Sequence, residues 1–282
     1  MSAAQNLIDF MWRVPKDGFR WVIAHEALKP DGKGGRYLVP VNRSAIPYLP
    51  LVEHTGLFRQ FSATSTNEEG VLAFANKFGF LGSATRAVTP SDESGLVYGE
   101  KLDEWQVAID AIRPMVSLWN ATKIGEKGRR ELARRIHWNA CSVRYEDEHG
   151  GHELIISDRH HPELFERFPE GDLAGPAMYL IQGRVNQALA EHRVGPKLLW
   201  DPTEGAFVVR LSAQNLVGAL WLQFTRAIEG DKNYKQCLNC RDWIEVGGNR
   251  TARSDKKFCS PTCKSAFHRA NNEQSKHRER TR

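Results

Sequence analysis

Four of the five cysteines lie within a 27-residue stretch, and this cluster constrains the fold more than any other feature of the chain. The spacing is C-x2-C, then 18 residues, then C-x3-C, formed by Cys237, Cys240, Cys259 and Cys263. Two closely spaced pairs can direct four thiolates at one tetrahedral metal ion, which leaves no coordination position for water. We therefore predict that these cysteines bind one structural, non-catalytic Zn²⁺ ion.

Local sequence around the second pair predicts how the cysteines are held. Ser260 is a favourable N-cap and Pro261 a favourable first helical residue, so we expect Cys259 at a strand end and Cys263 in the first helical turn. A segment this short cannot bury a stable apolar core by itself, and metal ligation is expected to supply much of its folding free energy. The expected result is a treble-clef-like module of knuckle, hairpin and helix.

The absence of export or membrane signals supports metal binding over disulfides. No apolar run reaches the roughly 18 to 20 residues that span a bilayer, and the first residues lack the order of a secretion signal. We therefore expect a cytoplasmic protein without membrane contact, whose thiols stay reduced. We expect the fifth cysteine, Cys141, to be a small buried hydrophobe.

The positive charge of the chain is concentrated on the same module. The whole chain carries +5, but residues 235–282 hold 12 Lys and Arg against 5 Asp and Glu, a net +7 that leaves −2 for residues 1–234. Positive charge on a rigid lobe favours binding to nucleic-acid phosphates, although a solvated face without a partner has the same composition. The candidate nucleic-acid-binding residues are Arg250, Arg253, Lys256, Lys257, Lys264, His268 and Arg269.

The module also resembles a known family. An amphipathic helix, then CLNC, then Trp243 and GGNRTARSDKKFCSPTCKSAFHR, is similar to the C-terminal zinc finger of bacterial CGNR-type proteins and to FCS-type treble clefs. The resemblance covers residues 213–270 at most, and Lys264, Ser265 and Ala266 stand where the family has Gly-Asn-Arg. It implies a DNA-binding role in transcriptional regulation. The N-terminal 210 residues show no comparable resemblance.

The rest of the chain predicts an α+β fold with antiparallel hairpins. Alternating apolar residues and Gly-rich turns predict strands within 19–41, 142–157 and 197–212. Helical periodicity predicts helices over 66–79, 102–137, 174–192 and 213–230, with the first capped by Thr66 and the second interrupted at Pro114 and at Gly125–Gly128. Residues 84–100 are polar without a period, and we expect a surface loop there.

These patterns predict three parts. The first is an α+β domain over 1–230, with a break between two subdomains near 84–100. The zinc module follows over 231–272, and a basic flexible tail over 273–282.

Three classes of function remain open. The favoured one is a zinc-binding bacterial transcriptional regulator or accessory factor that contacts DNA phosphates. The second is an adaptor that uses the module to dock a protein partner, with homo-oligomer formation also open. The third is an RNA-acting or toxin-like enzyme, which ranks last because no catalytic spacing accompanies the polar turn residues. The residues that would serve it are Glu146, Asp147, Glu148, His149, His152, His160 and His161.

Overall fold

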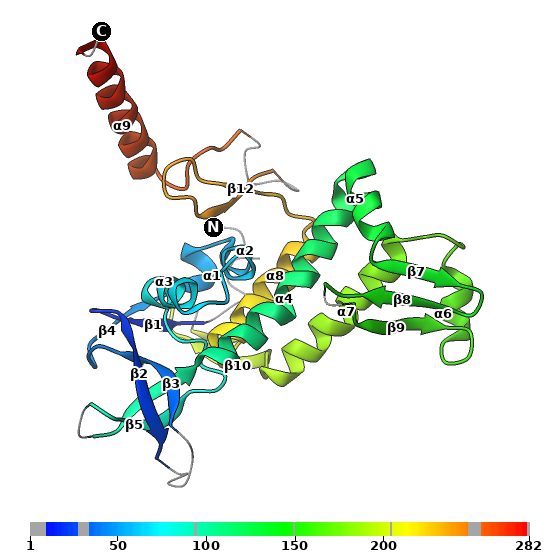
Figure 1. The fold of residues 1–282 in the computed structure, drawn as a ribbon, viewed down its shortest axis with the longest axis horizontal. Coiled ribbons are helices and arrows are strands. Elements are labelled where there is room, and N and C mark those ends of the chain that lie inside the picture. The colour runs from blue at the N-terminus through cyan, green and yellow to red at the C-terminus, as the bar shows by residue number, and fades with distance from the viewer. Residues whose placement is uncertain are drawn as a thin grey trace. The chain divides into compact units, whose positions relative to one another are not determined.

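The computed structural model describes residues 10–27, 34–92, 95–148, 150–203, 205–247 and 255–280, with side chains up to Asn271. The chain divides into two compact units, one formed by Met1–Gln106 with His192–Arg282 and the other by Val107–Glu191 (Figure 1). The second unit is therefore an insertion in the first, and the predicted α+β class is confirmed for the chain as a whole. No described helix is long and apolar enough to cross a membrane.

A small closed barrel with the strand order β2-β3-β6-β5 begins the first unit. Alternation along the strands turns one face inward, where Val22, Tyr37, Val39 and Val88 form a buried cluster. Its strands are β2 (Phe19–Glu26), β3 (Gly35–Pro40), β5 (Arg86–Pro90) and β6 (Val97–Lys101), and β1 (Trp12–Pro15) pairs separately with β4 (Ala45–Tyr48).

The expectation of a surface loop over 84–100 is wrong, because β5 and β6 pair with each other and with the first two barrel strands. These strands have only five residues each, and β6 buries Gly99 and the polar Glu100 while Tyr98 is exposed, so no apolar alternation marks it in the sequence.

Helices pack an aromatic core beside this barrel. Phe61 lies 5.1 Å from Phe74, and Phe58 lies 5.3 Å from Phe224, between ring centroids. The helices are α1 (Pro50–Glu53), α2 (Leu57–Ser62), α3 (Glu68–Phe78) and α8 (Leu216–Glu229). The cap of α3 is Asn67, whose side chain accepts the Gly70 N–H at 2.9 Å, and not the predicted Thr66.

Two buried polar side chains fasten loops to this core. Glu100 is 1% exposed and accepts the N–H groups of Leu81 at 2.9 Å and Gly82 at 2.6 Å, together with the Thr85 hydroxyl at 2.8 Å. Burial raises the pKa of Glu100, against the opposing effect of these three donors. Gln223 of α8 accepts the Phe58 N–H at 2.9 Å and donates to the His54 carbonyl at 2.7 Å.

The second unit places helices on a three-stranded antiparallel sheet of order β7-β8-β9. Its strands are β7 (Ile136–Asn139), β8 (Ser142–Glu146) and β9 (His152–Ser157). Its helices are the greater part of α4 (Leu102–Lys123), then α5 (Gly125–Ala133), α6 (Pro162–Arg167) and α7 (Ala174–Glu191).

Two expectations for this unit are wrong. Pro114 does not interrupt α4, because buried neighbours such as Ile112 and Met115 hold the helix together despite the lost hydrogen bond. Cys141 is exposed and not a buried hydrophobe. Asn139 pairs with Ser142 across the two strands, so Cys141 falls in the tight turn between them and outside the sheet.

A separate hairpin exposes an apolar face. Strands β10 (Gly195–Asp201) and β11 (Ala206–Ser212) pair only with each other among the described strands. On one face Leu198 is opposite Val209 and Trp200 is opposite Phe207, and all four are between 56% and 67% exposed. Monomeric proteins seldom leave several large apolar side chains together in water.

Candidate metal centre and the basic surface of its module

A short hairpin presents the first two cysteines. Strand β12 (Tyr234–Gln236) pairs with β13 (Trp243–Glu245), and Cys237 and Cys240 lie in the connection between them. The Cys237 N–H donates to the Asp242 carbonyl at 2.8 Å, and the Arg241 N–H donates to the Cys237 carbonyl at 3.0 Å. Arg241 adopts a left-handed φ of 64°, which turns the chain sharply after the second cysteine.

Cys263 lies in the first turn of α9 (Pro261–Arg280), as predicted. The expectation of a strand end at Cys259 is wrong, because the described residues 255–260 that lead into the helix form no strand. Ser260 caps the helix through its hydroxyl, which accepts the Cys263 N–H at 3.1 Å. Cys259 directly precedes this cap, and its N–H donates to the Cys237 sulfur at 3.4 Å. The helix continues to Arg280, through most of the segment for which the sequence predicted a flexible tail.

All four sulfurs lie within 4.8 Å of one another. The Cys240–Cys259 separation is 3.6 Å and the Cys259–Cys263 separation is 3.3 Å. Zinc–sulfur bonds of about 2.3 Å in a tetrahedron place sulfurs about 3.8 Å apart, so the cluster already has nearly the size that one metal ion requires. A donor set of four thiolates fits a closed, structural site and leaves no position for a reacting ligand.

The environment favours ionisation of part of the cluster. Burial raises the pKa of Cys237, but the N–H groups of Cys240, Cys259 and Asn239 aimed at its sulfur outweigh burial and lower that pKa to about 6. Hydrogen bonds with Cys259 and Asn239 lower the pKa of Cys263. Burial raises the pKa of both Cys240 and Cys259. A bound cation would compensate the charge of four thiolates in so small a volume.

A small apolar layer supports the cluster from behind. Cys237, Ile244 and Val246 are buried together, and Phe258 packs against them. The Phe258 ring also lies 5.3 Å from the Phe267 ring of α9. So few apolar side chains cannot hold the hairpin and helix together alone, which agrees with a metal-dependent fold.

The module also packs against the helices of the first unit. Arg59 of α2 is 8% exposed, and its guanidinium lies 4.9 Å from the Tyr234 ring centroid and 5.4 Å from that of Trp243. Trp243 lies so close to Gly56 that a Cβ there would come within 2.5 Å of it. Lys77 of α3 forms an ion pair with Asp242. These contacts hold both ends of the hairpin, since Tyr234 begins β12 whereas Asp242 and Trp243 lie at the end next to Cys237 and Cys240.

The candidate nucleic-acid-binding side chains fall into two groups. Arg250 and Arg253 lie outside the described residues. The described ones, Lys256, Lys257, Lys264, His268 and Arg269, are all exposed. The Lys257 carbonyl accepts the Leu238 N–H at 3.0 Å, so this lysine is fixed beside the cysteine knuckle. The last three candidates lie on α9.

The polar residues proposed for a second chemistry do not form a comparable site. His137 pairs with Glu146 at 2.9 Å, an interaction between neighbouring strands that the sequence analysis missed. The rings of His160 and His161 lie 6.5 Å apart. Among the described residues, which exclude His149, the four cysteines are the only group that brings at least three potential metal-ligand atoms together.

Comparison with family models, curated proteins and solved structures finds no match to this chain.

Proposed function

We propose that the C-terminal module is a structural zinc site that presents a basic surface to nucleic-acid phosphates, in a DNA-binding regulator or accessory factor. The observation that carries the proposal is a four-thiol cluster of tetrahedral size in a segment whose formal charge is +7. A closed site leaves the metal no catalytic position. Its contribution is to fix the lysines and arginines of the module relative to one another, which reduces the ordering cost of binding phosphates.

Salt dependence tests this proposal directly. Neutralising several phosphates releases counterions, so affinity for a DNA duplex should fall steeply between about 50 mM and about 200 mM salt in a mobility-shift titration of the full chain. A variant with four module cations replaced by Ala should bind DNA at least about 10-fold more weakly. Its plot of log binding constant against log salt concentration should be shallower by about 3 to 4. The replaced residues are Lys256, Lys257, Lys264 and Arg269.

A control variant separates local contacts from overall charge. It replaces four exposed cations outside the module and should bind DNA within about twofold of the parent at about 150 mM salt, where distant charges are screened. Equal losses in both variants, or an affinity that ignores salt, contradict the proposal. A single-stranded RNA of equal length, titrated in parallel, distinguishes the two nucleic acids. The control residues are Lys16, Arg43, Arg144 and Lys197.

A separate observation supports an association of two copies of the chain. The exposed face of the β10–β11 hairpin carries Leu198, Trp200, Phe207 and Val209 and no charge, so an identical face complements it. Aromatic side chains bury about 150 to 250 Å² each, and two such faces would together bury on the order of 1,000 Å². That area reaches the lower limit for a specific interface.

Replacing the two aromatic residues tests this association. Trp200→Ser with Phe207→Ser should convert a dimer into a monomer in sedimentation experiments, with the helix content unchanged. The matched control is Leu199→Ser with Val208→Ser, on the opposite face of the same hairpin, which should leave the dimer intact. A parent protein that stays monomeric at about 100 μM contradicts the proposal.

A further inference from the structure

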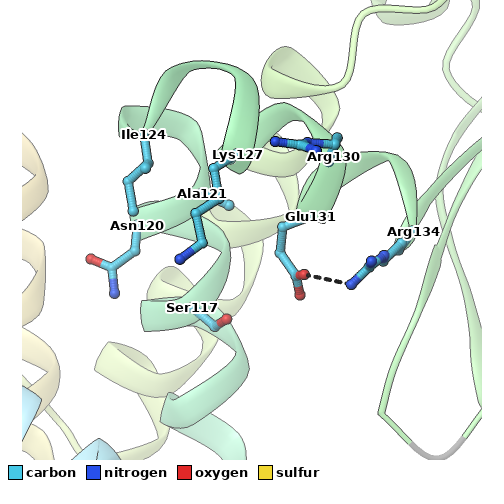
Figure 2. Close-up of a pocket in the computed structure, with 9 residues that line it drawn as sticks. Ser117, Asn120, Ala121, Ile124, Lys127, Arg130, Glu131 and Arg134 are labelled. Atoms are coloured by element: carbon cyan, nitrogen blue, oxygen red, sulfur yellow. Dashed lines mark ion pairs between the residues drawn. The ribbon is translucent and has the colours of Figure 1, made fainter.

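The second unit contains a pocket at the corner between α4 and α5. Its volume is about 510 Å³, within the range of about 300 to 1,000 Å³ that is typical of small-molecule sites. Side chains from both helices line it, as Figure 2 shows: Ser117 and Asn120 belong to α4, and Glu131 and Arg134 belong to the α5 side. The remaining lining residues are Ala121, Ile124, Lys127, Gly128 and Arg130.

Two glycines make this corner. Gly125 begins α5 with φ at +52°, a left-handed conformation that turns the chain directly after α4. At Gly128 a Cβ would lie 1.9 Å from the Ala121 carbonyl oxygen, so no larger residue allows the two helices to approach this closely. The pocket is thus a fixed consequence of the backbone at the α4–α5 corner.

The charge around the pocket is strongly positive. Residues 123–135 hold six Lys and Arg against two Asp and Glu, a net +4, whereas the remainder of residues 1–234 carries −6. Within the described part of the chain, neither Lys127 nor Arg130 makes an ion pair. A concentration of cations on an otherwise acidic part of the chain favours an anionic ligand.

The single carboxylate of the pocket does not cancel this charge. Glu131 lies 3.0 Å from Arg135, whose side chain is only 15% exposed and which also pairs with Glu148. The contact of Glu131 with Arg134 is longer, at 3.7 Å, and the Arg134 side chain is 79% exposed. Arg134 and Arg135 together balance the charges of Glu131 and Glu148, and two lining cations, Lys127 and Arg130, remain to meet a ligand.

The pocket also offers an apolar wall and neutral hydrogen-bonding groups. Ala121 is buried at its base, and Ile124 is 54% exposed at its rim. The Ser117 hydroxyl and the Asn120 amide add donors and acceptors on the α4 side. A phosphate ion alone is far too small to fill this space, and an apolar body attached to an anionic group would use both kinds of lining.

We propose that the α4–α5 pocket binds a small molecule in which a phosphate or carboxylate group is attached to an apolar body. Lys127 and Arg130 bind the anionic group, while Ala121 and Ile124 contact the body. Bound ligand is held by α4 and α5 together. This site is independent of the nucleic-acid surface proposed for the cysteine module.

Calorimetric titration of the full chain with three probes tests the site. Phenyl phosphate carries a phosphate on an apolar ring, octanoate carries a carboxylate on an aliphatic chain, and inorganic phosphate has no body. We expect saturable binding of at least one of the first two, with inorganic phosphate at least about 10-fold weaker. Which of these two probes binds shows whether the anionic group of the ligand is a phosphate or a carboxylate. If neither of these two probes binds at millimolar concentration, the proposal is overturned.

Two adjacent arginines provide a matched pair of variants. Arg130 lines the pocket and Arg129 does not, although both are exposed on the same helix. Arg130→Ala should weaken binding about 10-fold, the usual loss for one charge-assisted hydrogen bond, and Arg129→Ala should change it less than about twofold. Ile124→Ser should weaken the affinity for the probe that binds and leave the affinity for inorganic phosphate unchanged. Equal effects of Arg129→Ala and Arg130→Ala overturn the proposal, and unchanged thermal unfolding shows that each variant is folded.

Discussion

Removal of the metal from the full chain is expected to unfold the cysteine module while the helical core of the first unit stays folded. The module buries few apolar residues of its own, so we expect metal binding to supply most of its folding free energy. Structural zinc sites have apparent binding free energies of about 10 to 16 kcal/mol near neutral pH. Protein purified under reducing conditions should contain about one zinc per chain.

Limited proteolysis with and without a chelator measures this effect. The metal-bound protein should resist cleavage around Lys235 and Arg241, and the chelated protein should be cut there quickly, with protection restored by adding zinc. Cys237→Ser should abolish stoichiometric zinc, because the Cys237 sulfur is fully buried and accepts the Cys259 N–H. Cys141→Ser is the matched control, since Cys141 is exposed in a remote turn and should leave the zinc content unchanged.

Two results would contradict this expectation. One is a purified, reduced protein without stoichiometric metal. The other is a chelated protein whose C-terminal module keeps its resistance to protease, because the contacts of Arg59, Trp243 and Lys77 would then suffice to hold it. These contacts involve the β12–β13 hairpin and leave Cys259 and Cys263 outside them, so we expect the metal to be indispensable.

Replacing Glu100 by Gln is expected to destabilise the first unit by about 2 to 4 kcal/mol. The two carboxylate oxygens accept three hydrogen bonds, from Leu81, Gly82 and Thr85. An amide has only one oxygen, and its NH₂ group would face an N–H donor in a buried site. Denaturant unfolding monitored by tryptophan fluorescence measures the change in unfolding free energy. Glu229→Gln, at a surface ion pair, should change it by less than about 0.5 kcal/mol.

The pH dependence of stability provides an independent readout. Burial raises the folded-state pKa of Glu100, so the folded chain binds this proton more tightly than the unfolded chain does. The contribution of this group to stability is therefore fully present below the unfolded pKa of about 4.3 and is lost as pH rises through the folded pKa. Glu100→Gln should remove that part of the dependence, and an unchanged pH profile would contradict the assignment.

Sequence patterns predicted the parts of this chain whose structure depends on local interactions. The cysteine spacing gave the four-thiol cluster, and Ser260 with Pro261 gave the beginning of α9. The long helices and the β10–β11 hairpin follow from hydrophobic periodicity and turn residues.

The features that sequence did not predict depend on distant contacts. Strands β5 and β6 are short, and they exist because they pair with β2 and β3, which are far away in the chain. Nothing in the local sequence marks Gln223 and Glu100 as buried, because the backbone groups that they hydrogen-bond belong to segments distant in the chain. The α4–α5 pocket required the close approach at Gly128, which no periodicity reveals.

The insertion of residues 107–191 into the first unit has a consequence for the order in which a growing chain can fold. Domains fold as units during synthesis, at about 5 to 20 residues per second. The inserted unit is complete once residue 191 has left the ribosome. At that point α8, which packs against α2 through the Phe58–Phe224 contact, has not yet been synthesised. The earlier half of the first unit must therefore wait, with apolar surface exposed, until residues 216–229 emerge. The apolar surface of this early segment therefore stays exposed during synthesis. The four-cysteine cluster can form only after Cys263 has been added.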